Sequence, residues 1–372
     1  MKIFQVLTAL GSGGAERFVI DLSNELAIKH EVTLVILYSI DNNSFLLNEI
    51  SSNVHIVSMN KKPGVELGLF VRLKKLIDKE QPDIVHCHLS GIIYTLLGYL
   101  RKSKSKYLYT VHSDAKYDAE DFLSTVIRKI AFKFCNVHPV TISEESKKSF
   151  TSFYGLPSSV IYNGRPCYKR PKQENLNLVI NEIEGMKFNK DAVVIVNVAR
   201  LNKVKNQLTL AKAVASLNEK GYKIELFNIG DTNDFEVLDS IKKLKSPYVH
   251  LLGLKSNPRD YIYVSDAFCL TSLIEGMPIT LIECFSVGII PICTPVGGIK
   301  NMIQDNISGI LSTDTTQSSI EEALVRFIEM PKEKRKLMQS ESLNLFENFS
   351  IKTCALKYES LMYSFCLNKS IL

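Results

Sequence analysis

Short apolar runs alternate with longer segments of helical periodicity from one end of this chain to the other. Strands of a buried parallel sheet are short and continuously apolar, and helices cross over between them. The alternation therefore predicts an α/β fold. We predict helices at residues 15–29, 67–79 and 121–134, and strands at 2–7, 32–37, 54–57, 84–88, 107–112, 138–142, 160–162, 193–198, 223–229, 250–252, 267–270 and 289–292.

The alternation is interrupted between residues 163 and 189, where the sequence is polar, charged and contains proline. At 372 residues the chain also exceeds the size of one ordinary hydrophobic core. We therefore predict two doubly wound domains, residues 1–165 and 191–354, joined by a linker at 166–190. Ligands of open α/β sheets bind beyond the carboxyl ends of the strands, so the expected site is a cleft between two such domains.

Charge and cysteine content narrow the class of function. A net charge of +6 is small for this length and does not indicate a nucleic-acid-binding protein, although it suits an anionic ligand or lipid surface. The eight cysteines form no C-x-x-C pair, which is typical of reduced thiols in a cytoplasmic protein. The first apolar run is too short for a secretion signal, and no run of 18 apolar residues is present, so membrane contact would be peripheral.

Two glutamates, Glu275 and Glu283, stand on either side of a predicted helix start. Pro278 is tolerated in the first helical turn, and Gly288 is a typical residue for the end, so we predict a helix between them. The free N–H groups and dipole of a helix start favour an anionic ligand. Glutamates also occur on surface helices without a function, and their spacing alone does not decide between these interpretations.

A glycine-rich segment, Gly11 to Glu16, follows the first strand and opens a helix. Glycines allow the backbone to approach a phosphate or a sugar closely. The nicotinamide-dinucleotide fingerprint G-x-G-x-x-G fails at Glu16, which argues against dinucleotide binding. A tight turn between strand and helix explains the same glycines.

Two cations, Arg200 and Lys205, follow the strand at 193–198. A planar guanidinium combined with a mobile ammonium suits a diphosphate. Lys203, on the same loop, is expected to be a solvated surface charge. The strand at 223–229 ends in Gly230 and Asp231, which predicts another close-approach turn beside the same site.

Histidines mark the ends of two strands in the first half. His112 ends the strand at 107–112 and could hydrogen-bond a substrate hydroxyl, although a lone histidine is often structural. His86 and His88 alternate on one strand, but the sequence suggests no third ligand, so we expect no metal site. An Asp-x-Asp motif for a divalent ion is also missing from the sequence.

Six segments together resemble the retaining glycosyltransferases of family 4, which have the two-domain GT-B architecture of Rossmann-like domains. They occur in the family's order along nearly the whole chain: Gly13–Glu16, Asp83–His88, Thr110–His112, Val160–Gly164, Ala199–Lys205 and Glu275–Glu283. The family often has Gly-Arg-Leu and Lys-Gly where this chain has Ala199-Arg200 and Lys205-Asn206, a departure that keeps both cations. A C-terminal helix returning to the first domain is a further family feature, which residues 355–372 could supply.

The resemblance implies roles for individual residues. Glu283 would hold the nucleotide ribose, and Glu275 the donor sugar, together with the backbone of Gly276 and Met277. The helix start at Pro278 and Ile279 would lie near the diphosphate. Arg200 and Lys205 would be the diphosphate clamp. The remaining assignments are His112 against the reacting sugar, Gly13 and Gly14 in the loop over it, Gly230 and Asp231 beside the donor, and the backbone near Gly253 and Leu254 for the base.

The implied reaction is glycosyl transfer from a nucleotide diphosphate sugar with retention, without a metal or other cofactor. Family frequency favours a uridine donor, and the acceptor would be a glycan or lipid-linked precursor of a surface polysaccharide. A non-catalytic sugar-binding protein and a GT-B epimerase or hydrolase are the competing interpretations.

An apolar stripe between residues 122 and 134 could rest on an anionic membrane, which would place the protein in the cytoplasm at the inner face of a membrane. Packing of an ordinary core helix explains the stripe equally well. The stripe consists of Phe122, Leu123, Val126, Ile127, Ile130, Ala131 and Phe134, flanked by Arg128, Lys129 and Lys133.

Overall fold

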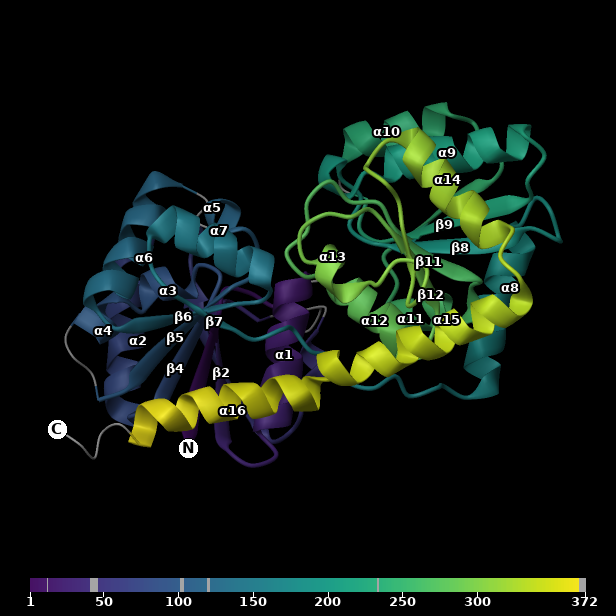
Figure 1. Cartoon of the computed structure of the whole chain (residues 1–372). Coiled ribbons are helices and arrows are strands. Elements are labelled where there is room, and N and C mark those ends of the chain that lie inside the picture. The colour runs from purple at the N-terminus through teal and green to yellow at the C-terminus, as the bar shows by residue number, and fades with distance from the viewer. Residues whose placement is uncertain (12, 41–45, 101–103, 119–120, 233, 368–372) are drawn as a thin grey trace. The chain divides into compact units, whose positions relative to one another are not determined.

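A computed structural model of the chain describes residues 1–11, 13–40, 46–100, 104–118, 121–232 and 234–367. The chain forms two compact units, which we call unit 1 (Met1–Pro166 with Phe349–Leu372) and unit 2 (Cys167–Asn348). Each unit is a parallel sheet with helices on both of its faces (Figure 1). The predicted α/β class is therefore confirmed.

Unit 1 is built on a seven-stranded parallel sheet with the strand order β3-β2-β1-β4-β5-β6-β7. Its strands are β1 (Lys2–Leu7), β2 (Glu31–Tyr38), β3 (Val54–Lys61), β4 (Ile84–His88), β5 (Lys106–Val111), β6 (Val137–Thr141) and β7 (Ser159–Val160). Its helices are α1 (Gly14–Leu26), α2 (Leu67–Glu80), α3 (Gly91–Tyr94), α4 (Leu96–Leu100), α5 (Ala115–Asp118), α6 (Phe122–Phe134), α7 (Glu144–Tyr154) and α16 (Ile351–Leu367), with a 3-10 turn, η1 (Leu47–Glu49).

Unit 2 is built on a six-stranded parallel sheet with the order β10-β9-β8-β11-β12-β13. Its strands are β8 (Val193–Val198), β9 (Ile224–Ile229), β10 (Val249–Gly253), β11 (Ala267–Leu270), β12 (Ile290–Cys293) and β13 (Ile310–Leu311). Its helices are α8 (Gln173–Met186), α9 (Gln207–Glu219), α10 (Phe235–Lys243), α11 (Pro258–Val264), α12 (Ile279–Val287), α13 (Ile299–Met302), α14 (Gln317–Ile328) and α15 (Lys332–Leu345). The 3-10 turn η2 (Lys203–Lys205) precedes α9, and η3 (Phe346–Phe349) follows α15.

In both sheets the early strands are added on one side of the unit's first strand and the later strands on its other side. β1 lies between β2 and β4, and β8 lies between β9 and β11. Neighbouring strands leave such a switch point in opposite directions, which opens a crevice at their carboxyl ends. The loops after these strands are therefore the places where each unit can hold a ligand.

The expected linker at 166–190 contains a helix instead. Helix α8 occupies Gln173–Met186, with Leu176, Val179 and Ile183 buried at helical spacing against unit 2. The polar residues that suggested a linker lie on its other faces. The unit boundary therefore falls at the start of the expected linker.

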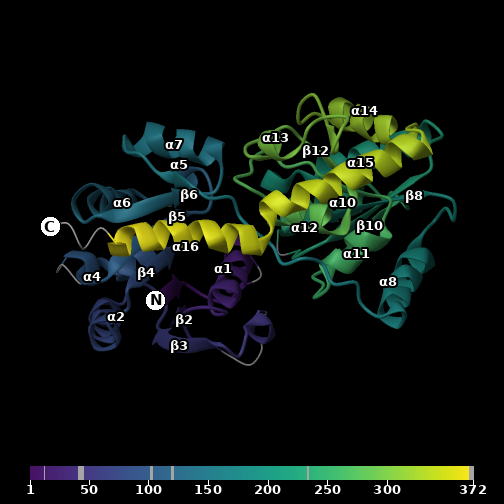
Figure 2. The same cartoon turned by 60° about the horizontal axis from the view of Figure 1, so that its bottom comes forward.

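Helix α16 belongs to unit 1 and packs against α1 (Figures 1 and 2). It begins at Ile351, four residues before the segment in which we expected a C-terminal helix. Its buried face consists of Ile351, Cys354, Ala355, Tyr358 and Met362. Unit 1 is therefore completed by chain that follows unit 2 in the sequence.

Candidate functional site

Helix α12 begins and ends where the sequence predicts. Pro278 is its N-cap, and Gly288, with φ of +70°, ends it in the left-handed region. Glu283 lies inside this helix and is only 2 % exposed. Glu275 comes before the helix, so the two carboxylates lie on either side of its start, as expected.

The carboxylate of Glu275 is held by two side chains, Ser272 from the same segment and Lys205 from a distant part of unit 2. Lys205 Nζ and Ser272 Oγ each donate a hydrogen bond to Glu275 Oε1, both at 2.6 Å. The Glu275 side chain is 8 % exposed and that of Lys205 is 25 % exposed. A charge pair with so little solvent access is stronger than one on an open surface. The structure thus brings together a cation and a carboxylate that are far apart in the sequence.

The position of Lys205 is fixed by the asparagines around it. Asn202 Oδ1 accepts a hydrogen bond of 2.9 Å from the backbone N–H of Lys205 and thereby caps η2. Asn206 then takes the left-handed conformation, with φ of +58°, and starts α9. Asparagine tolerates this conformation better than most residues. Asn206 thus adopts a conformation that a glycine at this position would also tolerate.

Gly297 packs directly against the backbone of Glu275. Its φ is +49°, and a Cβ at this position would overlap the carbonyl oxygen of Glu275. The next residue, Gly298, donates its N–H to the carbonyl of Gly276 at 3.0 Å. The loop after β12 therefore packs against the backbone of the segment before α12 and holds it in place. Gly297 has no local sequence signal that connects it to Glu275, so it could not be predicted as part of this site.

Arg200 follows β8, and its side chain is exposed. Its carbonyl oxygen accepts a hydrogen bond of 3.0 Å from Nε2 of the buried Gln207, which fixes the backbone of the loop. Within the described part of the chain, the guanidinium of Arg200 has no hydrogen-bond or ion-pair partner. It is therefore available to an anionic ligand.

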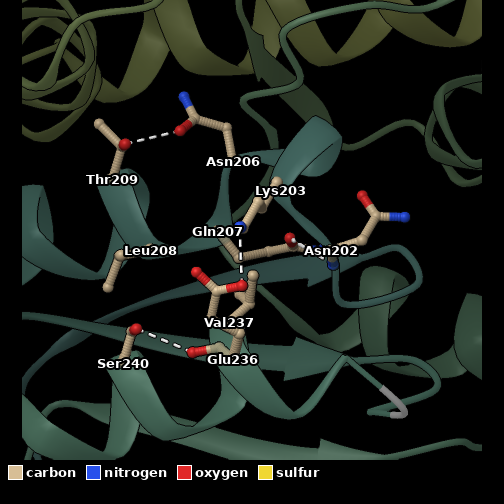
Figure 3. A pocket seen from close by; sticks show the side chains of 9 residues that line it. All are labelled: Asn202, Lys203, Asn206, Gln207, Leu208, Thr209, Glu236, Val237 and Ser240. Carbon is tan, nitrogen blue, oxygen red and sulfur yellow. Dashed lines mark hydrogen bonds and ion pairs between the residues drawn. The ribbon is translucent and has the colours of Figure 1, made fainter.

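Lys203 differs from its two basic neighbours. It forms an exposed ion pair of 2.7 Å with Glu236 of α10, at the rim of a small hollow between the 202–209 segment and α10 (Figure 3). This agrees with its expected place as a surface charge.

The strand ends beside Arg200 form one connected edge. Gly230 has φ of +151°, and a Cβ there would overlap the carbonyl oxygen of Ala199. Its N–H donates to the carbonyl of Gly253 at 2.9 Å, and the carbonyl of Asp231 accepts from the N–H of Leu201 at 2.8 Å. Leu254, after this edge, is half-exposed. The structure therefore places the predicted residues of three strand ends together.

In unit 1, Gly13 is the N-cap of α1 and Gly14 is its first residue. A Cβ on Gly13 would meet the carboxylate of Glu16, so the side chain of Glu16 folds back against the loop. The geometry is compatible both with a tight turn between strand and helix and with a loop that approaches a ligand.

His112 lies immediately after β5, partly exposed. Its Nε2 is 3.0 Å from Nδ1 of His88, and its ring packs edge-on against Phe18 with centroids 5.8 Å apart. Its backbone N–H donates to Asp118 Oδ1 at 3.2 Å. Burial lowers the pKa of His112 to about 3, so the ring is neutral at physiological pH.

The other strand histidine, His86, has a separate partner. His86 Nε2 is 2.8 Å from Thr110 Oγ1, which in turn is 2.9 Å from the hydroxyl of Tyr358 on α16. Among the described residues, no group of three or more His, Cys, Asp or Glu side chains is arranged to hold a metal ion.

Most of the apolar stripe of α6 faces solvent. Phe122 is 84 % exposed, Leu123 67 % and Phe134 71 %, and Ile130 is also exposed. Of the stripe only Ala131 is fully buried, in the core with Phe132, and the other buried positions of the helix are Ser124 and Arg128. Arg128, expected on the flank, is 1 % exposed and pairs with Asp118 at 3.5 Å between Arg128 Nε and Asp118 Oδ2. Burying an arginine in place of the stripe turns the apolar side chains toward solvent.

Lysines accompany this exposed stripe. Lys129 and Lys133 are exposed on α6, and Lys133 Nζ lies 5.6 Å from the ring centroid of Phe134. Within the described residues, no helix is long and apolar enough to cross a membrane.

Two family models match this chain, and their matches leave only short segments uncovered. "Glycosyltransferase Family 4" matches residues 12–167, and "Glycosyl transferases group 1" matches residues 180–342.

Two curated enzymes are similar to the chain over most of its length. A Campylobacter jejuni alpha-1,4-N-acetyl-D-galactosaminyltransferase, named for a diNAcBac-PP-undecaprenol-linked acceptor, is 24 % identical over 84 % of this chain and 84 % of its own length. An Escherichia coli UDP-Gal:alpha-D-GlcNAc-diphosphoundecaprenol alpha-1,3-galactosyltransferase is 29 % identical over 70 % of both chains. Among solved structures, Anabaena HepE in complex with UDP and glucose superposes with a TM-score of 0.81, over 98 % of this chain and 100 % of that one, at 17 % identity.

Proposed function

This chain belongs to the group 1 glycosyltransferases of the GT-B fold, and we propose that it moves a sugar from a UDP-sugar to a lipid-linked glycan with retention of the anomeric configuration. The observation that carries the proposal is the pairing of Lys205 with Glu275 at the start of α12. It puts a cation and a carboxylate just before the N-terminus of a buried helix.

The chemistry of this site suits a nucleotide diphosphate sugar. Lys205 and Arg200 are the cations that would take the two phosphates, and the α12 N-terminus favours the same negative charge. When a phosphate attracts Lys205, Glu275 becomes free to accept a hydrogen bond from a sugar hydroxyl. Catalysis would then rest on positioning and on stabilising the charge of the departing diphosphate. We propose that these protein cations replace a metal, so that transfer continues in the presence of a chelator.

The relatives support the choice of donor and acceptor. The Escherichia coli enzyme is named for UDP-Gal, and both curated enzymes are named for undecaprenol-linked acceptors. We infer that this chain acts in the same kind of pathway, the assembly of a surface polysaccharide on a lipid carrier.

A lipid-linked acceptor requires the enzyme to reach a membrane surface, and we propose α6 as the contact. Its exposed Phe122, Leu123, Ile130 and Phe134 can enter the headgroup region while Lys129 and Lys133 meet anionic lipids. We propose that this contact is made at the cytoplasmic face of the membrane.

Alanine variants of the two cations test the donor site. We expect Arg200→Ala and Lys205→Ala to lower kcat by about 100-fold or more without unfolding the protein, because each removes charge stabilisation from the leaving group. Lys203→Ala is the matched control, since Lys203 is on the same loop but pairs with Glu236, and its turnover should stay normal. Near-normal transfer by both site variants would refute the assignment.

The substrate assay also separates the competing functions. Purified protein is incubated with UDP-sugars, with and without a lipid-linked acceptor. Release of UDP that depends on the acceptor, with an α-linked product from an α-linked donor, supports the proposal. Breakdown without acceptor would indicate an epimerase or hydrolase, and binding without breakdown would indicate a non-catalytic protein.

Vesicle flotation tests the membrane contact separately. The protein should float with anionic vesicles, and Phe122→Ser with Phe134→Ser should abolish flotation. Phe235→Ser removes an equally exposed phenylalanine from unit 2 and serves as the control. Equal flotation of all three proteins would exclude α6 as the contact.

A further inference from the structure

A row of polar side chains leads from the centre of the unit 1 sheet to His112. Gln5 lies on β1, His88 ends β4, and His112 follows β5. Gln5 Oε1 is 2.8 Å from His88 Nε2, and His88 Nδ1 is 3.0 Å from His112 Nε2. Gln5 and His88 are both fully buried. The row therefore has a closed end in the core and an open end at His112.

Proton positions along this row depend on one another. A neutral imidazole carries one N–H, so one ring nitrogen donates while the other accepts. In the structure the amide of Gln5 turns its oxygen toward His88 and leaves its own nitrogen buried without a hydrogen-bond partner among the described residues. An amide oxygen can only accept, so in this orientation the proton of His88 is on Nε2, whereas the opposite amide orientation would put it on Nδ1. His88 Nδ1 is then bare and can only accept, which requires the proton of His112 to be on Nε2 as well.

We propose that Gln5 and His88 are positioning residues that hold His112 in a single tautomer, with its proton on Nε2 and with Nδ1 bare. Nδ1 of His112 has no hydrogen-bond partner within the described residues, so it is the ring nitrogen that a ligand can reach. A bare nitrogen accepts a hydrogen bond, and the group it selects is a hydroxyl of the bound sugar. The proposal rests on the proposed function only in taking a sugar as that ligand.

Two further observations support the proposal. Burial lowers the pKa values of His88 and His112, so neither ring gains the second proton that would erase the difference between tautomers. The ring of His112 is also held from the side by Phe18, and its backbone by Asp118. The ring can therefore present one fixed nitrogen, as an orienting partner requires.

Nitrogen NMR of the whole labelled protein tests the tautomer without any substrate. Two-bond proton–nitrogen correlation distinguishes the tautomers of a neutral histidine, and the His112→Gln variant identifies the signals of His112. We expect the Nε2–H form alone in the wild-type protein at neutral pH. A wild-type spectrum showing the Nδ1–H form, or a mixture of both, would overturn the proposal. Because no sugar is present, this result does not depend on whether the protein transfers sugar.

Variants then test the origin of the tautomer. Gln5→Met removes the acceptor at similar size, and we expect both tautomers of His112 to appear. If they become equally populated, the competent fraction of the free protein halves, so the apparent donor KM should rise about twofold while kcat at saturating donor changes little. Tyr358→Phe is the matched control, because it removes a hydroxyl from the neighbouring His86–Thr110 pair and should leave the His112 signals unchanged. An unchanged His112 tautomer in Gln5→Met would refute the role of Gln5.

Discussion

An added methyl group at Gly297 tests how the backbone of Glu275 is held in the proposed donor site. Its φ is +49°, and a Cβ there would overlap the carbonyl oxygen of Glu275. The left-handed conformation costs an ordinary residue about 1–2 kcal/mol. Pressing a methyl group against packed backbone adds about 1–3 kcal/mol. We therefore expect Gly297→Ala to lower the free energy of unfolding of unit 2 by about 2–5 kcal/mol.

Gly221→Ala separates the two contributions. Gly221 also lies in unit 2 and has φ of +91°, but nothing lies within 4 Å of a Cβ added there. This variant should show only the backbone cost, about 1–2 kcal/mol. A unit of this size loses about 2–4 °C of melting temperature per kcal/mol, so calorimetry should find Gly297→Ala melting about 2–12 °C below Gly221→Ala.

The same methyl group should also weaken donor binding. Any shift of the Glu275 backbone moves the carboxylate away from Lys205 and from the α12 start. The donor KM of Gly297→Ala should therefore rise, while that of Gly221→Ala should not. The reasoning fails if Gly297→Ala melts at or above the temperature of Gly221→Ala and keeps a normal donor KM.

Two more predictions concern unit 1. Arg128→Met leaves Asp118 buried without its cation and should lower the free energy of unfolding by about 3–5 kcal/mol; urea titration measures this loss, and exposed Lys129→Met should change stability by no more than about 0.5 kcal/mol. Burial lowers the pKa values of His86 and His112 to about 3 from an ordinary 6.5. Below pH 6.5 the unfolded chain therefore binds protons that the folded chain does not, so stability should fall as the pH decreases from 6.5 toward 3, by about 1.4 kcal/mol per pH unit for each histidine. A melting temperature that stays constant between pH 7 and pH 5 would contradict this.

Much of the fold could be predicted because buried parallel strands have a clear pattern. The strands at 2–7, 84–88, 193–198 and 267–270 have the predicted bounds, since each is a short and mostly apolar run. β13 has only two residues, too few for a periodic pattern. Helix α8 was missed because only three of its side chains are buried, so its composition is that of a linker.

Site residues that directly follow a strand could be predicted from the sequence. Contacts between residues far apart in the sequence could not. Glu275 and Lys205 could be proposed separately from their local positions. Their pairing, and the contact of Gly297 with Glu275, depend on how distant loops pack, for which the sequence has no local signal. The same holds for Gln5, because its contact with His88 joins two strands that are far apart in the sequence.

On α6, the sequence showed the apolar stripe but not the direction in which it points. Helical periodicity identifies a face, and a face of this kind can be turned toward a core or toward solvent. The buried Arg128 decides between them, because its pairing with Asp118 and its contact with Tyr109 fix the rotation of the helix.

Unit 1 consists of two segments of the chain separated by unit 2, so it cannot be completed until the end of translation. Thr110 and His86 are made early, but Tyr358, which completes their hydrogen-bonded row, emerges from the ribosome only after all of unit 2. Until then, the surface that α16 covers on α1 is open to water and to chaperones. Domains generally fold as they are synthesised, so unit 2 should finish folding first although it is the second to begin. A nascent chain that stops before α16 would have a complete unit 2 but an unfinished unit 1, so any activity that needs both units has to wait for the completed chain.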